Sequence, residues 1–293
     1  MISKIKVPMS QPAVDSETEN YMFDVIKSGW WSQGKITKQF EKNLSEYFPS
    51  NVVVVNNGTS AITAALLAHG IKPGDKVVVP DYTFIATCSA AKIIGAEILV
   101  ADVDPNTLNV KPQSIEKLVK ENDVKAVMVV DMAGLPVDLE PIIELSKRYK
   151  FVLIEDAAQA IGSEYKNKKI GSFEHTSTFS FTAAKIITTI EGGCITTGNK
   201  DILEKLFQIR NFGRSGDGEY VHILNSVNFR FNDIQAALGI KQLEQINKFI
   251  ARRIEIAKMY EENIENVTFQ HTPDYTTIHS HMLFFVFAKN NEM

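Results

Sequence analysis

The strongest indication of chemistry comes from Lys185, which lies in a segment of apolar and small side chains, Phe179–Ile187. Enclosure by such neighbours lowers the pKa of an amine and frees its lone pair to attack a carbonyl carbon, which is Schiff-base chemistry. Most lysines are solvated, however. A side chain that extends to solvent is therefore the favoured interpretation when Lys185 is considered alone.

A carboxylate ends a second feature, the apolar run Phe151–Ile154 that is followed by Glu155 and Asp156. An acid at the carboxyl end of a buried parallel strand lies where open α/β sheets bind ligands. Because an unpaired buried charge costs on the order of several kcal/mol, Asp156 is expected to have a cationic or hydrogen-bonding partner. For the acid alone, a structural salt bridge or a helix cap is the stronger interpretation.

A candidate phosphate site lies where the apolar strand Val52–Val55 turns at Gly58 into a helix. Unpaired backbone N–H groups and the positive end of the helix dipole meet there, with the Thr59 and Ser60 hydroxyls as further donors. For this segment alone, Thr59 or Ser60 acting only as a helix cap is the better interpretation. No Walker lysine and no GxGxxG pattern follows, so nucleotide-binding motifs are absent.

The three features together meet the requirements of pyridoxal phosphate (PLP). The segment at Thr59 and Ser60 supplies an anion pocket, Asp156 supplies a partner for the pyridinium nitrogen, and Lys185 supplies the amine for covalent attachment. The combination is much more specific than any one of its parts. We expect no metal ion in such a site.

Aromatic residues could contact the same ligand. The segment Pro80–Thr87 leaves a strand at the ligand-binding edge, so Phe84, or as a second choice Tyr82, could cover the face of the pyridine ring. Packing in the core is about as good an interpretation for either ring. Trp30 and Trp31 stand in a glycine-flanked loop, where capping of a core and lining of an interface or ligand cleft have equal weight.

Alternating strands and helices must position these residues. Between Val52 and Phe181, short β-branched runs alternate with longer amphipathic stretches, which is typical of a parallel sheet with crossover helices. The predicted strands are 52–55, 76–79, 98–101, 125–130, 151–154 and 177–181, and the predicted helices between them are 60–69, 86–94, 112–120 and 139–149. The fold class is therefore α/β.

The flanking segments have a different pattern. Helices are predicted at Glu17–Lys27 and Thr37–Phe48, and one long helical pattern runs from about Asn232 to Asn263. Beyond it, Met282–Ala288 is a single strand candidate. A lone strand does not form a sheet, so this region is expected to be the start of a second domain.

The composition is that of an ordinary globular protein, with 293 residues, 44% hydrophobic, 23% charged and a net charge of -4. We expect a large domain over 1–245, and a linking helix with part of a small domain over 246–293. The acidic balance offers no general attraction for nucleic acid or membrane surfaces, and no window approaches the roughly 18 apolar residues of a membrane span. Cys88 and Cys194 favour a reducing compartment over a disulfide, so we expect buried thiols in a cytoplasmic protein.

The ordered motifs resemble those of the DegT/DnrJ/EryC1/StrS family of sugar-nucleotide aminotransferases, which are PLP enzymes of the aspartate aminotransferase fold, fold type I. The resemblance runs from about Ile5 to the carboxyl end. It implies a large α/β domain with a mostly parallel sheet. The motifs that carry it are Gly29-Trp30 with Gly34, Phe40-Glu41, Asn57–Ala61, Pro80–Thr87, Ile154–Gln159, Phe179–Phe181 with Lys185, Arg210–Gly213, Asn228–Arg230 and Gln235–Ala237.

The resemblance implies a role for each site residue. Lys185 would form the covalent link to PLP and transfer the proton, and Asp156 would keep the ring nitrogen protonated. Phe84 would stack on the ring and Gln159 would reach the ring hydroxyl. The residues implied to bind the phosphate are Thr59, Ser60 and Ser180.

The resemblance also implies a homodimer with shared active sites, in which Asn228 reaches the phosphate of the neighbouring subunit. The loop with Trp30, Trp31 and Ser32 would face the sugar nucleotide. The segment from Lys185 to Gly193 is most similar to perosamine synthases, which aminate C4 of a 4-keto-6-deoxy sugar nucleotide. The implied reaction is ping-pong, with glutamate as the usual donor, and it would serve amino-sugar and polysaccharide synthesis.

Two departures from the family pattern leave alternatives open. Ala183-Ala184 replaces the Gly-Asn of the perosamine-type members, and relatives continue through a complete small domain after the strand at Met282–Ala288, whereas this sequence ends at Met293. The resemblance therefore implies an incomplete small domain. The alternatives are a truncated non-catalytic or regulatory remnant, or a PLP-dependent sugar dehydratase. The dehydratases carry histidine at position 185, so the lysine favours amino transfer.

Overall fold

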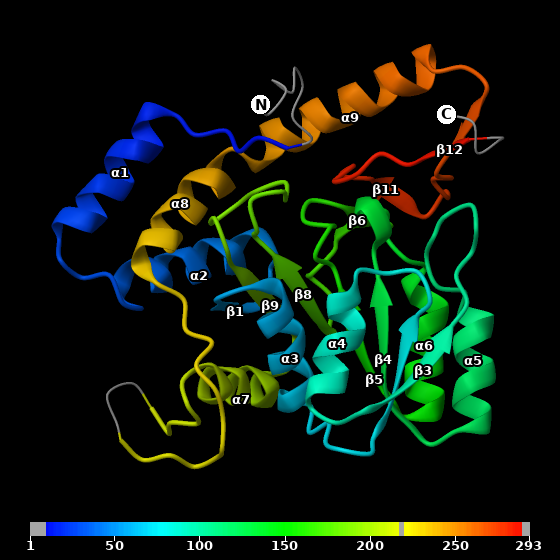
Figure 1. The fold of residues 1–293 in the computed structure, drawn as a ribbon, viewed down its shortest axis with the longest axis horizontal. Helices are drawn as coiled ribbons and strands as arrows, with labels where there is room; N and C mark the ends of the chain where they lie inside the picture. The colour runs from blue at the N-terminus through cyan, green and yellow to red at the C-terminus, as the bar shows by residue number, and fades with distance from the viewer. Residues whose placement is uncertain (1–9, 217–219, 289–293) are drawn as a thin grey trace, which may run out of the picture.

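The computed structural model describes residues 10–216 and 220–288, which build one central sheet with helices on both faces (Figure 1). The helices are α1 (Ser16–Lys27), α2 (Lys35–Tyr47), α3 (Gly58–Ala68), α4 (Ile85–Ile93), α5 (Pro112–Glu121), α6 (Leu139–Tyr149), α7 (Lys200–Arg210), α8 (Asp233–Glu244) and α9 (Ile246–Asn263), with a 3-10 turn η1 (Met132–Gly134). The strands are β1 (Asn51–Val55), β2 (Lys76–Pro80), β3 (Glu97–Ala101), β4 (Val124–Val130), β5 (Val152–Asp156), β6 (Glu164–Tyr165), β7 (Lys168–Lys169), β8 (Thr176–Ser180), β9 (Gly193–Thr197), β10 (Val267–Phe269), β11 (Thr276–Ile278) and β12 (Val286–Ala288).

The central sheet has the strand order β1-β9-β8-β5-β4-β2-β3. Neighbours from β8 to β3 are parallel, whereas β9 is antiparallel to both β8 and β1. The predicted α/β class with a mostly parallel sheet is confirmed. The predicted strands are all present, and β9 enters between two of them without having been predicted.

Alternation along the strands sends side chains to two separate cores. Val52 and Val54 of β1 belong to the core beneath α2, α5, α6 and α8, and Val53 and Val55 belong to the core beneath α3, α4 and α7. Because both faces are covered, the strands read as continuous apolar runs rather than as alternating ones. Adjacent residues at a strand end therefore face different layers, which decides which of them can reach a ligand.

The prediction of one long helix after Asn232 is wrong. Gln245 has φ -101° and ψ 0°, which ends α8, and α9 begins at the next residue. The break re-aims the chain so that Ile246 and Ile250 are buried, whereas Ile254 is 39% exposed. An apolar pattern that continues across a break does not reveal the break, because both helices bury a face against the same core.

The prediction of a lone carboxyl-terminal strand is also wrong. The strand is shorter than predicted, and this β12 pairs antiparallel with β10. The intervening β11 pairs antiparallel with β6, next to the central sheet (Figure 1). These three-residue strands are too short for their sequence pattern to stand out, and hydrogen bonding to distant partners stabilises them.

In the described part of the chain, no helix is both long enough and apolar enough to cross a membrane. Of the two thiols expected to be buried, Cys194 is buried and Cys88 is only half-buried. Both are free, as predicted.

Candidate active site

A cavity of about 980 Å³ lies at the edge of the sheet where the parallel strands end. Val130, Asp156 and Ser180, which are the last residues of β4, β5 and β8, all line it. Open α/β sheets bind ligands at this edge. The predicted site residues in its wall are Thr59, Ser60, Phe84, Asp156, Gln159, Ser180 and Lys185.

Asp156 is a buried acid with specific partners. Its Oδ2 accepts a hydrogen bond of 2.7 Å from the Thr87 hydroxyl in the first turn of α4, and its Oδ1 accepts one of 3.2 Å from the Ala158 N–H. Burial raises the pKa of the carboxyl above its ordinary value, while Thr87, Ala158 and the charge of Lys185 oppose that rise. The hydrogen bonds favour the ionised form that a cationic ligand would need.

Lys185 lies in the turn that follows β8, with its backbone N–H 2.9 Å from the Thr182 carbonyl oxygen. The side chain is half-buried in the cavity wall. Burial lowers the pKa of the amine, and the charge of Asp156 raises it by a smaller amount. The lysine and the aspartate therefore interact across the cavity, and the amine has the lowered basicity that a nucleophile requires.

The start of α3 forms one end of the cavity, where the phosphate site is predicted. Asn57 caps this helix, since its side chain accepts a 2.8 Å hydrogen bond from the Ser60 N–H. Thr59 and Ser60 are not the cap, so the interpretation of them as cap residues is wrong. A Cβ on Gly58 would lie 2.8 Å from the Cβ of Ser180, so the glycine allows the helix to approach β8 closely.

Gln159 and Phe84 line other parts of the wall. The Gln159 Oε1 accepts a 2.8 Å hydrogen bond from the Ala133 N–H, which leaves the amide nitrogen as the free end of the side chain. Phe84 is 69% exposed and lines the cavity. Tyr82, the second choice, is outside the wall and packs edge-on against Phe285 at a centroid distance of 6.3 Å.

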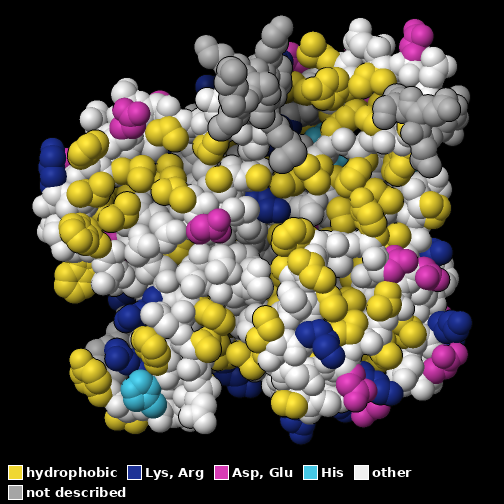
Figure 2. Space-filling view, viewed as in Figure 1, with side chains coloured by type: hydrophobic (Ala, Val, Ile, Leu, Met, Phe, Trp, Pro, Cys, Tyr) yellow, Lys and Arg dark blue, Asp and Glu magenta, His cyan; other side chains and the backbone are white. Residues whose placement is uncertain are grey.

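Four predicted site residues lie outside this cavity. Trp30 and Trp31 are 61% and 55% exposed, so neither caps a core, and Ser32 is exposed beside them. Figure 2 shows hydrophobic side chains gathered over α1 and its neighbourhood. Asn228 is exposed as well, and its Oδ1 accepts hydrogen bonds from the backbone and side chain of Arg230.

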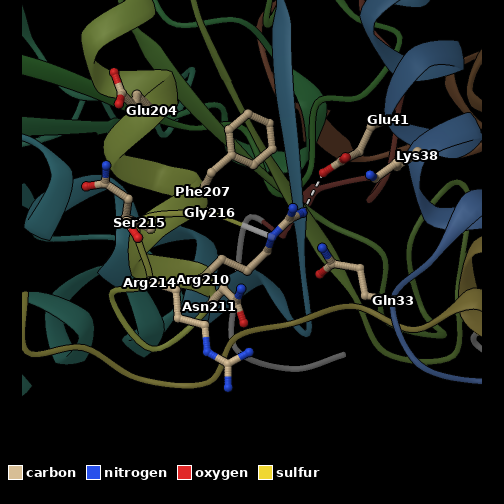
Figure 3. Close-up of a pocket in the computed structure, with 11 residues that line it drawn as sticks. Gln33, Lys38, Glu41, Glu204, Phe207, Arg210, Asn211, Arg214, Ser215 and Gly216 are labelled. Carbon is tan, nitrogen blue, oxygen red and sulfur yellow. Dashed lines mark hydrogen bonds and ion pairs between the residues drawn. The ribbon is translucent and has the colours of Figure 1, made fainter. Parts of the chain in front are cut away.

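A second cavity, of about 450 Å³, lies between α2 and α7 and is separate from the first (Figure 3). In it, Arg210 points to Glu41 with an Nη1–Oε1 distance of 2.5 Å, and the same nitrogen is 2.9 Å from the Val54 carbonyl oxygen. Both side chains are almost fully buried. A buried ion pair that also holds a strand is structural, so this cavity is not the candidate active site.

Thr87 and Glu191 lie at the cavity without having been predicted as site residues. Thr87 is fully buried, and its hydroxyl is also 2.8 Å from that of Thr83, which forms a short hydrogen-bonded chain behind Asp156. Glu191 lines the cavity and accepts a 3.0 Å hydrogen bond from Thr182. The available signal for Thr87 was its position in the first turn of the helix that follows β2.

Comparison with known proteins agrees with this geometry. The family model described as "DegT/DnrJ/EryC1/StrS aminotransferase family" matches residues 12–293. The GDP-perosamine synthase of Escherichia coli O157:H7 is 36% identical over 288 residues, which cover 98% of this chain and 79% of that protein. The GDP-perosamine synthase of Caulobacter vibrioides is 34% identical, with 97% and 76% covered.

Solved structures have the same fold. Helicobacter pylori PseC, described as an aminotransferase involved in the biosynthesis of pseudoaminic acid, has a TM-score of 0.87 at 31% identity, covering 94% of this chain and 76% of that one. The 3-amino-5-hydroxybenzoic acid synthase has a TM-score of 0.88 at 30% identity, with 93% and 73% covered. By its sequence, its fold and its cavity, the chain belongs to the DegT/DnrJ/EryC1/StrS aminotransferase family.

Proposed function

We propose that this protein is a PLP-dependent aminotransferase that moves an amino group from an amino acid, with glutamate as the expected donor, to the keto group of a nucleotide-linked 4-keto-6-deoxy sugar. The observation that carries the proposal is one cavity that contains a half-buried lysine, a buried aspartate and a helix N-terminus with two hydroxyls. The names of the perosamine synthases, which are about one third identical, support the sugar class.

The cavity fits PLP in size and in chemistry. A volume of about 980 Å³ accommodates a cofactor together with part of a substrate. The α3 N-terminus offers unpaired N–H groups to a phosphate, and Gly58 keeps that end open where a Cβ would collide with Ser180. When bound, PLP supplies an electron-withdrawing ring that stabilises negative charge on the carbon next to the substrate nitrogen.

The residues that line the cavity would bind different parts of the cofactor. Thr59, Ser60 and Ser180 donate hydrogen bonds to the phosphate, and Asp156 accepts one from the protonated ring nitrogen. The Asp156 carboxylate stays in position because Thr87 and Ala158 hold both of its oxygens. A fixed anion at this place keeps the ring cationic, which is the form that withdraws electrons.

Gln159 and Phe84 would hold the ring at its remaining sides. The Ala133 N–H binds the Gln159 carbonyl oxygen, so the amide nitrogen is the end that donates to the ring hydroxyl. Phe84 covers the ring face, and its high exposure leaves it free to pack against a ligand. Lys185 accepts and returns the proton at its Nζ, because burial lowers the pKa of the amine and so favours the neutral form that can accept a proton.

The proposed active unit is a homodimer. Asn228 of one subunit would reach the phosphate held by the other, and Trp30, Trp31 and Ser32 would contact the sugar nucleotide. All four residues are exposed in the single chain, which leaves them available to a second subunit or a large substrate.

Substitution of the lysine tests the proposal. Purified protein with excess PLP is expected to show the visible absorption of the covalently bound cofactor, and Lys185→Ala is expected to abolish both this absorption and amino transfer. Turnover is measured with glutamate and a panel of keto-sugar nucleotides, which also identifies the sugar. Lys72→Ala, which removes an exposed lysine that does not line the cavity, is the matched control and keeps both signals. A wild-type protein that stays colourless with ample PLP contradicts the proposal.

A further inference from the structure

A second acid, Glu155, lies next to Asp156 on the opposite face of the sheet. It is fully buried, and its Oε2 accepts a 2.6 Å hydrogen bond from Ser177 and lies 3.2 Å from the His175 Nε2. Its Oε1 is buried and has no hydrogen-bond donor. A buried carboxylate oxygen without a donor is costly, so another group is expected to supply a proton.

Asp131 resembles Glu155 in that only one of its two carboxylate oxygens has a hydrogen-bond donor. It directly follows β4 and is fully buried, and its Oδ1 accepts a 2.9 Å hydrogen bond from the Val137 N–H. Its Oδ2 is buried and has no donor. Two neighbouring acids therefore each have one oxygen satisfied and one oxygen unsatisfied.

The sheet register brings the two acids to one face. β4 and β5 are parallel with Val129 opposite Glu155 and Val130 opposite Asp156. Side chains alternate along a strand, so Asp131 leaves the sheet on the side of Val129 and Glu155. Val129 lies in the core beneath α5 and α6, away from the cavity. Leu153, which is two residues before Glu155 on β5 and so on the same face, lies in that core too.

Two ionised carboxylates in direct contact and out of water repel each other strongly. Burial raises the pKa of Asp131 well above its ordinary value, and the neighbouring Glu155 carboxylate and the charge of Asp156 add to the rise. The other titratable groups here are His175, which faces the far oxygen of Glu155, and Tyr275, whose phenol pKa is raised by burial and by acids that include Asp131.

We propose that Asp131 and Glu155 share one proton between Oδ2 and Oε1, and that this singly charged pair is a positioning device that lets Asp156 remain ionised. The shared proton satisfies both unsatisfied oxygens at once. It also limits the negative charge behind Asp156 to one unit instead of two. The role in catalysis rests on the proposed function of Asp156, whereas the shared proton does not.

Infrared spectroscopy of the whole protein in D2O tests the shared proton without any cofactor. At neutral pH the wild type is expected to show the C=O stretch of one buried protonated carboxyl group. Asp131→Asn removes that group, and Glu155→Gln removes it too, because an amide at position 155 donates to Asp131 and lets it ionise. Both single variants are therefore expected to lack the band.

Asp138→Asn is the matched control, because Asp138 is a nearby acid that binds the Tyr165 hydroxyl and takes no part in the pair. It keeps the band. Absence of the band in the wild type, or its persistence in Asp131→Asn, overturns the proposal. Persistence in Glu155→Gln would mean that Asp131 holds a proton of its own, which overturns the sharing.

The effect on Asp156 is tested by PLP binding as a function of pH. Each single amide variant keeps one negative charge in the pair, so the acid limb of PLP binding is expected to stay near that of the wild type. The double variant D131N/E155Q has none, so the acid limb should move to lower pH by about one unit. An unmoved or upward-shifted limb in the double variant contradicts the positioning role, and failure of the infrared arm leaves the proposed aminotransferase function untouched.

Discussion

Two opposing effects act on Asp156, and Thr87 decides their balance. Burial raises the pKa of this carboxyl, and the largest opposing contribution is the hydrogen bond from the Thr87 hydroxyl. Replacement by valine keeps the shape of the side chain and removes only the donor. The ionised form of Asp156, which the proposed reaction needs, would then be harder to reach.

For Thr87→Val we expect the acid limb of the activity profile to move to higher pH by about one to two units, since a hydrogen bond to a charged group contributes roughly 1.5–3 kcal/mol. The measurement is kcat/KM against pH for both proteins. Thr83→Val is the control, because Thr83 contacts Thr87 rather than Asp156. Equal limbs in the wild type and Thr87→Val would show that this hydroxyl does not govern the acid.

The raised pKa of Asp156 in the wild-type protein also affects its stability. Because the pKa of Asp156 in the folded protein is raised above its ordinary value of 3.8, the folded state binds the proton more tightly than the unfolded state. The free energy of unfolding therefore falls as the pH rises from the ordinary value through the folded value. Asp156 is retained at a cost in stability, which is common for acids in active sites.

At the scale of elements, Asp233 joins two helices that are far apart in sequence. It is the first residue of α8, and its carboxylate accepts hydrogen bonds from the N–H groups of Gly34, Ile36 and Thr37 at the start of α2. The Thr37 hydroxyl donates a further one of 2.7 Å. Gly34, the N-cap residue of α2, has no side chain to cap the helix, so the Asp233 carboxylate from α8 caps it instead.

We expect Asp233→Ala to lower the free energy of unfolding by roughly 2–4 kcal/mol, because it leaves several buried donors without an acceptor. Urea unfolding, followed by circular dichroism, measures the loss. Asp24→Ala is the control, since it removes an exposed acid from α1, whereas Asp233 is buried. A loss no larger than that of the control would mean that α2 needs no cap from α8.

At the scale of the whole molecule, the carboxyl-terminal segment is joined to the central domain at Gly134. Ser280 is buried there, and its hydroxyl lies 2.7 Å from that of Ser163. Gly134 has φ +93°, and a Cβ on it would lie 2.5 Å from the Ser280 Oγ and 2.8 Å from the Gln159 carbonyl oxygen. The close approach connects the packing of this segment with the position of Gln159 in the cavity wall.

Gly134→Ala is therefore expected to destabilise the protein by more than Gly70→Ala. Gly70 has a similar φ of +78° with nothing within 4 Å of an added Cβ, so it isolates backbone strain, which costs about 1 kcal/mol. The difference between the two variants in thermal unfolding measures the collision with Ser280 and Gln159. Equal losses of stability in the two variants would mean that the carboxyl-terminal segment moves to make room for the added methyl group at no further cost in free energy.

Much of the fold and of the site followed from local pattern. The run Phe151–Ile154 with Asp156 after it predicted both a strand and its ligand-binding end, because a buried strand must be apolar and the acid can be tolerated only where it finds a partner. The glycine turn before Thr59 predicted the helix start, and the apolar surroundings of Lys185 predicted its lowered basicity. Each of these signals lies within ten residues of chain.

Tertiary structure alone decided which distant groups meet. The choice of Thr87 as the partner of Asp156, the influence of Glu155 on the pKa of Asp131, and the pairing of β12 with β10 all join segments that are many residues apart. A sequence period states which face of an element is buried and leaves open which neighbour covers it. That choice depends on the sum of many weak contacts over the whole chain, so it exists only once the chain has folded.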